Sequence, residues 1–558
     1  MKTKNLLPIY IVTVCFALLT LTSVAQSPTW QWAKIGSGIN SSENATSIAV
    51  DASGNVLVTG TFKSTTITFG TITLTNAETG SADSGDMFIV KYDAAGNVLW
   101  AKSASGSYWD YGYSVATDGS GNVLVTGSFQ SSTIAFGTIT LTNTGPASSN
   151  IFIVKYDAAG NVLWAKSAGG SSLDYGNSIA TDVSGNILVT GHFSSPTITF
   201  GTTTLTNAGT WNMFIVKYDT NGNVLWAKST GGSDVDEGTS VATDGSGNVM
   251  VTGYFTDSIL TFGTTTLTNL GSYDMFIVKY DAAGNIIWAK GEGGSDADGA
   301  NSVATDDSGN IVVTGNFYDS TITFGTTTLT NVGNDDMFIV KYDAAGNTIW
   351  VKSAGGSTDD YSNSVVTDGS GNILVTGSFQ SSTIAFGTTT LTNLGSYDMF
   401  IVKYDAAGNI IWAKSAGGSS LDYANSIATD GSGNVLVTGS FFSSTISFGT
   451  ITLTNASVVN SNVFIAKINT TTGIENIENS SEILLYPNPT NGLITLSLSQ
   501  KLNNAAIKLI NITGQMVMEK TNLAGDKFTF DILEQTKGFY FLEVKEAGSI
   551  SRIKLVKN

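Results

Sequence analysis

The chain repeats itself, and this internal repetition limits the possible folds more than any other feature. The tripeptide Val-Thr-Gly occurs seven times in the 558 residues, and successive copies are 62 to 67 residues apart. The threonines of these copies are Thr59, Thr126, Thr190, Thr252, Thr314, Thr376 and Thr438. A period of this kind, carried through most of a chain, is typical of solenoids, propellers and other arrays of one supersecondary unit.

Each unit predicts four short β-strands. In the second unit we expect strands at 114–117, 122–129, 151–156 and 161–166, because Val, Ile, Phe, Tyr and Trp dominate these segments. The turns between them are built from Asp, Gly, Ser and Asn, which favour tight hairpin turns. The apolar runs do not alternate with polar residues, so both faces of each sheet are expected to be buried. Radially packed blades provide such surroundings.

The two ends of the array complement each other. The last unit stops after Phe464-Ile465-Ala466-Lys467-Ile468 without a fourth strand, and a segment of the missing type, Trp30-Gln31-Trp32-Ala33-Lys34, stands near the N-terminus. A first strand that completes the last blade closes a ring and removes a free sheet edge. The sequence therefore predicts an all-β fold over residues 26–472: a seven-bladed β-propeller with four-stranded blades, in which the N-terminal strand closes the last blade.

The repeated unit also resembles a known family. Its motifs Trp-Ala-Lys, Asp-Gly-Ser-Gly-Asn-Val-Leu-Val-Thr-Gly-Ser-Phe and Phe-Ile-Val-Lys-Tyr-Asp are similar to the bacterial SBBP β-propeller repeat over residues 30–469. The resemblance implies a seven-bladed propeller. It implies little about activity, because the family is defined by its fold.

The charge of the chain argues against one class of partner. The net charge is −18, and the repeat region contains no arginine. An acidic surface of this kind repels phosphate backbones, so we expect no nucleic-acid partner.

The N-terminus has the pattern of a signal peptide over residues 1–25. Lys2 and Lys4 precede an apolar run at 6–21, and Ser23-Val24-Ala25 provides the small residues that signal peptidase requires. We expect cleavage between Ala25 and Gln26, with a lipoprotein signal at Cys15, the only cysteine, as the alternative. The mature chain is then expected to have no disulfide and no transmembrane segment.

A second domain is expected at 483–558, after a polar linker at 473–482. Alternating strands at 493–498, 506–510, 528–531, 538–544 and 551–556 predict a small β-sandwich. The domain resembles the type A sorting domain of the bacterial type IX secretion system, through Tyr486, Pro487, Asn488, Pro489, Gly492, Lys554 and Lys557. The resemblance implies export by the type IX secretion machinery after signal-peptide removal, and a secreted or outer-surface location.

No catalytic set is predicted. His192 is the only histidine, which excludes a His-based metal site or a Cys–His pair, and we expect a structural role for it. Carboxylates recur at equivalent places in the units, whereas an active site normally breaks the symmetry of a repeat. We therefore expect that the protein is not an enzyme.

One set of carboxylates is a candidate ligand or metal site. Each unit carries one acid five residues before the first apolar residue of its first strand: Glu43, Asp110, Asp174, Asp236, Asp298, Asp360 and Asp422. We expect them in loops on one face, near the mouth of the central channel, where they would attract Ca²⁺ or a cationic ligand. The alternative is that each acid caps its own Gly/Ser loop. Calcium is the only cofactor that the sequence suggests.

Aromatic residues in the same loops suggest a binding surface. They include Tyr108, Trp109, Tyr111, Tyr113, Tyr175, Trp211, Tyr273, Tyr361, Tyr397 and Tyr423. Such rings stack on sugars or pack against neighbouring loops. Three function classes remain: a surface adhesion or binding module for a glycan or protein, a structural coat or matrix protein without a specific ligand, and, less favoured, a polysaccharide hydrolase or lyase.

Overall fold

The computed structural model describes residues 28–38, 41–77, 84–143, 145, 148–455, 457, 459–470, 483–511, 515–546 and 549–558. These residues fall into two compact units, one up to residue 470 and one from residue 483. The predicted signal peptide, its cleavage site at Ala25 and Gln26, and the predicted linker at 473–482 lie outside the described residues. Every secondary-structure element in the described residues is a β-strand. These residues therefore contain no helix of the length and apolarity that a membrane span requires.

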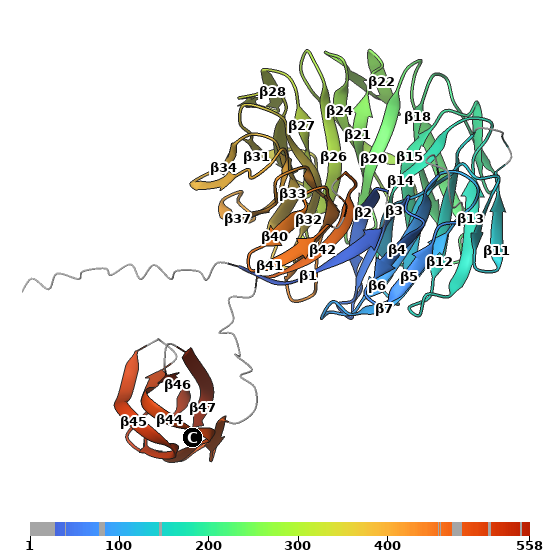
Figure 1. Ribbon diagram of the computed structural model, residues 1–558. Coiled ribbons are helices and arrows are strands. Elements are labelled where there is room, and N and C mark those ends of the chain that lie inside the picture. The colour runs from blue at the N-terminus through green and yellow to red at the C-terminus, as the bar shows by residue number, and fades with distance from the viewer. Residues whose placement is uncertain are drawn as a thin grey trace, which may run out of the picture. The chain divides into compact units, whose positions relative to one another are not determined.

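The first unit is a propeller-like array of repeated four-stranded antiparallel sheets (Figure 1). We number them sheets 1 to 7 along the chain, and in each the first to fourth strands are hydrogen-bonded in that order. The first strands are β2 (Glu43–Val50), β8 (Asp110–Thr117), β14 (Asp174–Thr181), β20 (Asp236–Thr243), β26 (Asp298–Thr305), β32 (Asp360–Thr367) and β38 (Asp422–Thr429). The second strands are β3 (Val56–Phe62), β9 (Val123–Phe129), β15 (Ile187–Phe193), β21 (Val249–Phe255), β27 (Ile311–Phe317), β33 (Ile373–Phe379) and β39 (Val435–Phe441).

The outer half of each sheet repeats in the same way. The third strands are β6 (Asp86–Tyr92), β12 (Asn150–Tyr156), β18 (Asn212–Tyr218), β24 (Asp274–Tyr280), β30 (Asp336–Tyr342), β36 (Asp398–Tyr404) and β42 (Asn462–Asn469). The fourth strands are β7 (Val98–Ala104), β13 (Val162–Ala168), β19 (Val224–Thr230), β25 (Ile286–Glu292), β31 (Thr348–Ala354), β37 (Ile410–Ala416) and, in sheet 7, β1 (Thr29–Gly38).

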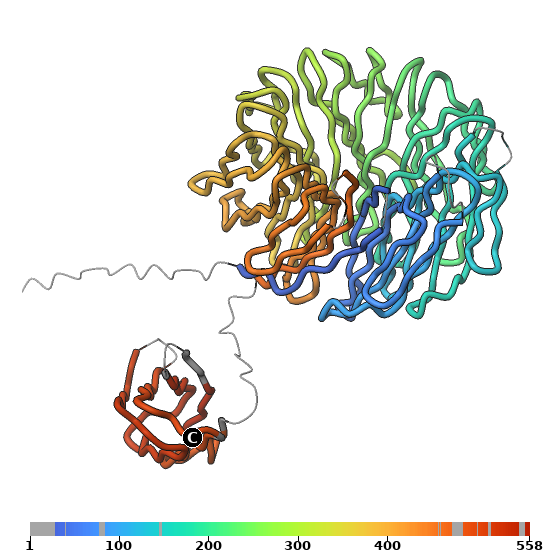
Figure 2. Tube along the Cα trace, viewed as in Figure 1, coloured from blue at the N-terminus to red at the C-terminus, as the bar shows by residue number. Residues whose placement is uncertain are grey.

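The N-terminal strand lies beside the end of the array, as the missing fourth strand predicts. β1 pairs antiparallel with β42, from Thr29 opposite Asn469 to Gly36 opposite Val463. The tube in Figure 2 shows this blue strand against the orange strands of the last unit. Without β1, the hydrogen-bonding edge of β42 would be open.

A small hairpin joins the second and third strands of every sheet. The seven hairpins are β4–β5 (Thr66–Phe69, Ile72–Thr75), β10–β11 (Thr133–Phe136, Ile139–Thr142), β16–β17 (Thr197–Phe200, Thr203–Thr206), β22–β23 (Ile259–Phe262, Thr265–Thr268), β28–β29 (Thr321–Phe324, Thr327–Thr330), β34–β35 (Thr383–Phe386, Thr389–Thr392) and β40–β41 (Thr445–Phe448, Ile451–Thr454). In sheet 3 the hairpin buries Ile198, Phe200 and Leu205 in the sheet's hydrophobic core, against the outer strand β19.

The Val-Thr-Gly motif has a structural cause. Thr190 Oγ1 donates a hydrogen bond of 2.6 Å to the main-chain oxygen of Phe214 on the third strand, so the buried hydroxyl is satisfied. A Cβ atom on Gly191 would lie 1.9 Å from the carbonyl oxygen of Tyr175 on the first strand. This close approach occurs where the first strand bulges between Gly176 and Ser178.

The second unit is built from β43 (Ile483–Tyr486), β44 (Leu493–Asn511), β45 (Met516–Asp531), β46 (Gly538–Glu546) and β47 (Ser549–Lys557). They form one five-stranded antiparallel sheet in which the long strand β44 pairs with β43, β45 and β46. The strands predicted at 493–498 and 506–510 are two halves of β44, joined through irregular pairing near Leu502 and Ala505. The polar residues between the two halves, Asn503 and Asn504, resemble a turn in the sequence, so two strands were predicted where the structure has one.

Candidate functional site

The seven candidate carboxylates are buried, one at the start of each first strand. Glu43 begins β2, Asp110 begins β8, and the other five occupy the same place in their sheets with no exposed surface. The prediction that they lie in loops is wrong. Each first strand begins four residues before the predicted start because a bulge, between Gly112 and Ser114 in β8, carries pairing past the small residues.

Asp174 shows what these carboxylates do. Its Oδ2 atom accepts hydrogen bonds from the Gly170 main-chain N–H at 2.8 Å and from Ser195 Oγ at 2.7 Å, and its Oδ1 atom accepts one from the Ser195 N–H at 3.1 Å. Burial raises the pKa of Asp174 despite these bonds. The arrangement matches the loop-capping alternative. Among the described residues, no three carboxylate, histidine or cysteine side chains form a group that could hold a metal ion; cation binding by these seven acids stays a prediction.

Two sheets depart from this pattern. The serine that contacts the buried acid is replaced by Asp257 in sheet 4 and by Asp319 in sheet 5. Burial and the nearby Asp257 raise the pKa of Asp236 to about 8, and burial and Asp319 do the same for Asp298. These two sheets therefore bury pairs of carboxyl groups.

The opposite end of every sheet carries a buried ion pair. The predicted turn former Asp118 accepts hydrogen bonds from the main-chain N–H groups of Ser120 and Asn122, as expected for such a turn. It also lies 2.9 Å from Lys155 Nζ on the third strand. The same pair recurs in all seven sheets as Lys91–Asp51, Lys155–Asp118, Lys217–Asp182, Lys279–Asp244, Lys341–Asp306, Lys403–Asp368 and Lys467–Asp430. This end is uniform from sheet to sheet.

The sheets differ most where the first strands begin, the second strands end and the third strands begin. We call this end the variable face. The second residue of the first strand is Asn44, Tyr111, Tyr175, Glu237, Gly299, Tyr361 or Tyr423. The residue after Val-Thr-Gly is Thr61, Ser128, His192, Tyr254, Asn316, Ser378 or Ser440. The residue before the third strand is Gly85, Ser149, Trp211, Tyr273, Asp335, Tyr397 or Ser461.

Aromatic rings follow one another across the variable face. One chain of rings over sheets 2 and 3 consists of Trp109, Tyr111, Tyr113, Tyr175, His192 and Trp211. Neighbouring ring centroids are 4.3 to 6.3 Å apart, and the planes of Trp109 and Tyr111 are within 2° of parallel. Tyr361, Tyr397 and Tyr423 form a second chain. Eight of the ten predicted aromatic residues thus pack in these two chains, Tyr273 packs against Tyr254, and Tyr108 is exposed.

A partly exposed acid, Glu237, contacts the first chain of rings near its end. Tyr254 Oη donates a hydrogen bond of 2.7 Å to Glu237 Oε2, and Asn177 Nδ2 donates one of 2.8 Å to Glu237 Oε1. His192 Nδ1 lies 3.5 Å from the same Oε1 atom. Burial raises the pKa of Glu237, but the nearby His192 and the hydrogen bonds from Tyr254 and Asn177 outweigh it and hold the pKa below its usual value. His192, which we expected to be structural, packs between Tyr175 and Trp211.

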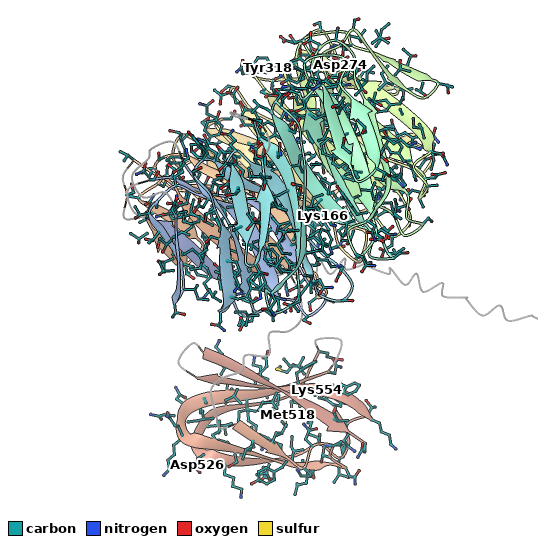
Figure 3. The ribbon with its side chains drawn as sticks, turned by 90° about the vertical axis from the view of Figure 1, so that its right-hand side faces the viewer. Lys166, Asp274, Tyr318, Met518, Asp526 and Lys554 are labelled. Atoms are coloured by element: carbon teal, nitrogen blue, oxygen red, sulfur yellow. The ribbon has the colours of Figure 1, made fainter. Side chains whose placement is uncertain are left out.

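A pocket of about 530 Å³ opens on the variable face over sheets 4 to 6. Its walls carry four tyrosines, two aspartates and two asparagines: Tyr254, Tyr273, Tyr318, Tyr361, Asp296, Asp335, Asn301 and Asn316. Figure 3 labels the pocket residue Tyr318 at the upper end of the repeat array. Asp274 is labelled beside it, and Lys166 is labelled lower down. Tyr254, Tyr318 and Asp335 were not predicted as site residues from the sequence. A position-by-position comparison of the seven sequence repeats would have found Tyr254 and Asp335, because each differs from the residues at the same position in the other repeats.

In the second unit, the predicted sorting residues are brought together. Asn488 Nδ2 donates a hydrogen bond of 2.7 Å to the Lys554 main-chain oxygen, and the Val556 N–H donates one of 2.9 Å to Asn488 Oδ1. Lys557 Nζ donates to the Asn491 main-chain oxygen at 2.9 Å. The opening segment is therefore tied to the terminal strand β47. Tyr486, Pro487, Asn488 and Pro489 are exposed, and the main-chain oxygen of Gly492 accepts a bond from Ile532.

Family models match both parts of the chain. Residues 484–558 match the secretion system C-terminal sorting domain, and residues 411–440 match the SBBP β-propeller repeat. Both predicted resemblances are confirmed. The sorting domain indicates export by type IX secretion to the cell surface or extracellular space, and thus interaction with that secretion machinery.

Two curated proteins are similar to the chain at low identity. An uncharacterized WD repeat-containing protein of Acanthamoeba polyphaga mimivirus is 27% identical over 65% of this chain and 32% of its own length. The regulatory protein FlaEY of Caulobacter vibrioides is 25% identical over 49% of this chain and 31% of its own length. The chain thus spans about a third of the length of these relatives.

Solved structures resemble the chain only loosely. A puromycin hydrolase mutant has 9% identity and a TM-score of 0.37, and covers 84% of this chain and 61% of its own. A mutant of the Synechocystis apocarotenoid oxygenase has 10% identity and a TM-score of 0.34, and covers 78% of this chain and 96% of its own. Likenesses this weak say nothing about activity in this protein.

Proposed function

We propose that this chain, an exported protein that carries a β-propeller repeat and a type IX sorting domain, is a non-enzymatic surface module that binds glycans through its variable face. One observation carries the proposal: sequence differences among nearly identical sheets gather at one end, where aromatic rings and a pocket also lie. A purely structural coat protein has no need of such differences. Tyrosine and tryptophan rings next to carboxylates and amides are suited to stacking on sugar rings and bonding their hydroxyls.

A closed ring of seven blades is part of this proposal. Its support is a circle of hydrogen bonds in which a first-strand N–H of one sheet donates to a serine Oγ of the preceding sheet. Val115 donates to Ser47 Oγ at 3.2 Å, and the pattern continues sheet by sheet. Ile48 of sheet 1 donates to Ser426 Oγ of sheet 7 at 3.2 Å, which completes the circle. A closed ring holds the variable residues of seven blades on one rigid surface.

The sorting domain is proposed to be a small sandwich. Its support is a single hydrophobic core to which both halves of β44 contribute, through Ile494 and Leu496 on one side and Ile507 and Leu509 on the other. Packing the two halves of a bent sheet against each other buries both apolar faces.

The test is binding of the purified protein to a panel of immobilised polysaccharides and oligosaccharides, once with Ca²⁺ and once with EDTA. We expect binding to a limited set of glycans. Tyr361→Ala, on the wall of the pocket, is expected to weaken binding about fivefold or more, since loss of an aromatic stacking partner costs about 1 kcal/mol or more. Leu163→Ala, which removes an exposed side chain from the outer strand β13, is the control and should not change binding.

Three results would count against the proposal in different ways. No binding to any glycan would favour the structural coat role. Binding that Tyr361→Ala leaves unchanged would move the site away from the pocket. Release of reducing ends from a bound polysaccharide would favour the hydrolase or lyase alternative.

A further inference from the structure

The charged side chains that line the pocket over sheets 4 to 6 are all acidic. Two aspartates, Asp296 and Asp335, lie on its wall, and no lysine, arginine or histidine is among the described residues that line it. Asp336, Asp359 and Asp360 lie close to Asp335 and act on its charge. A ligand with carboxylate or sulfate groups would be repelled here, whereas a cationic ligand would be attracted.

Asp335 is a buried acid on the pocket wall with a carboxylate oxygen that the described residues leave unsatisfied. It is only 8% exposed, and among the described residues its Oδ1 atom has no hydrogen-bond partner. A buried carboxylate oxygen without a partner costs about 1 to 3 kcal/mol relative to a satisfied one. Burial and the neighbouring carboxylates Asp359, Asp336 and Asp360 raise the pKa of Asp335 to about 7. A cation in the pocket would satisfy the free oxygen and stabilise the ionised form.

The surroundings of Asp335 favour an ammonium group over a metal ion. Metal ions such as Ca²⁺ need six to eight oxygen ligands, and no group of three acidic, histidine or cysteine ligands suited to a metal occurs in the part of the chain that the structure describes. Tyr273 and Tyr361 lie close enough to Asp335 for its charge to raise their pKa values, after the larger effect of burial. Tyrosine rings attract a cation at their faces, so rings and carboxylate suit the same ammonium group.

The spread of the rings favours a sugar as the carrier of that ammonium group. Tyr254 and Tyr273 come from sheet 4, Tyr318 from sheet 5 and Tyr361 from sheet 6. A single lysine side chain would occupy only part of a 530 Å³ pocket, whereas a short oligosaccharide can place several sugar rings against these faces.

We propose that this pocket binds a short oligosaccharide of amino sugars. One of its ammonium groups pairs with Asp335, and its sugar rings lie against the surrounding tyrosines. The inference rests on the proposed glycan-binding function and names the class of glycan.

The test is a calorimetric titration of the purified protein with three tetramers: glucosamine, N-acetylglucosamine and lysine. The two sugars differ in the charge of the amine and its acetyl group. We expect the glucosamine tetramer to bind about tenfold or more tightly than the acetylated one, because a hydrogen bond to a charged group contributes about 1.5 to 3 kcal/mol. Asp335→Asn should abolish this preference. Asp307→Asn, which removes one exposed charge at the uniform end of the same sheet 5, should preserve it.

Each other outcome overturns the inference. Equal affinity for the two sugars would leave glycan binding standing and remove the role of the ammonium group. A preference that survives Asp335→Asn would place the ammonium group elsewhere. Tighter binding of tetralysine would make the site one for basic peptides. If neither sugar tetramer binds, this inference fails, and the wider panel decides the proposed function separately. The unfolding temperature of each variant shows that lost binding is not lost folding.

Discussion

At the scale of residues, buried lysines contact two neighbouring sheets at once. Lys155 Nζ lies 2.9 Å from Asp118 in its own sheet and donates a hydrogen bond of 3.2 Å to the Thr220 main-chain oxygen of the next. Burial raises the pKa of Asp118, but its bonds to Asn122 and Lys155 outweigh this and lower the pKa below its usual value. A buried charge with such partners fixes geometry, and removal of one partner leaves the other uncompensated.

The first prediction isolates this ion pair. Asp118→Asn should lower the free energy of unfolding by about 3 to 5 kcal/mol, because it leaves the buried Lys155 without its counter-ion. Asp157→Asn is the matched control: Asp157 makes the same turn bonds to Ala159 and Asn161, but it is partly exposed, and among the described residues its carboxylate forms no ion pair with a lysine. Its cost should be about 1 kcal/mol. Denaturant unfolding of the two variants measures the difference, and equal losses would mean that the turn, not the ion pair, matters.

The second prediction concerns pH. Burial, aided by Asp319 and Asp274, raises the pKa of Asp298 to about 8 from its usual 3.8. The folded protein therefore binds this proton more tightly than the unfolded chain. The stability from this group is complete below the unfolded pKa and is lost as the pH rises through about 8. Asp298→Asn should stabilise the protein at pH 8 by more than about 1 kcal/mol and change little at pH 4. Unfolding midpoints at both pH values test this; destabilisation at pH 8 would contradict it.

Single residues were the hardest level to predict from the sequence. The acids such as Asp118 were recognisable as turn formers, because Asp, Gly and Asn fix a local turn whatever surrounds it. Their lysine partners were not, since Lys155 is 37 residues away and only the fold brings it near. Asp174 was placed in a loop because a bulge, which has no clear sequence signal, extends its strand. Asp335 could not be predicted as a site residue, because residues of three sheets line its pocket and only the fold brings them together.

At the scale of elements, neighbouring sheets are joined by the turn between the third and fourth strands. Trp100 Nε1 donates a hydrogen bond of 3.2 Å to the Ala158 main-chain oxygen of the next sheet, and Lys91 Nζ donates to the same oxygen at 3.3 Å. Gly160, in the same turn, has a φ of +83° and lies over the Trp100 ring. The turn is thus both a hairpin and a contact between sheets.

The third prediction separates these two roles of the turn. Gly160→Ala places a Cβ 2.9 Å from the Trp100 ring, in addition to the cost of about 1 to 2 kcal/mol for a positive φ. Gly121→Ala, at a φ of +76° with no atom within 4 Å of the added Cβ, carries the φ cost alone. Gly160→Ala should therefore lower the unfolding midpoint further than Gly121→Ala. Equal effects would show that the packing on Trp100 contributes nothing.

Most strands could be predicted, because apolar runs and turn residues alternate so regularly. The strand expected at 122–129 is β9, and that at 151–156 is β12, each within one residue. The error lay at the starts of the first strands, where residues such as Tyr111 and Gly112 have no apolar pattern. In the sorting domain, β44 was divided in two because the polar residues near Asn503 and Asn504 resemble a turn.

At the scale of the whole molecule, β1 is the element that joins the two ends of the repeat array. The fourth prediction is that deletion of Thr29–Gly38 exposes the edge of β42, because β1 is its pairing partner on that side. Hydrogen exchange of the β42 amides should then speed up strongly, while exchange in β30, which keeps both of its neighbours, should change little. Equal protection of the two strands in the deletion variant would show that the array does not depend on β1.

If differences among otherwise uniform sheets create the proposed binding face, then making the differing positions uniform should remove binding. In sheets 2, 6 and 7 the residue after Val-Thr-Gly is serine, so serine fits this position. The triple variant His192→Ser, Tyr254→Ser and Asn316→Ser makes the face more uniform. The measurement is the binding of the native protein and this variant to the same glycan panel. Selective binding is expected for the native protein, and the variant is expected to lose it with the fold retained. Identical binding profiles for the two proteins would contradict this expectation.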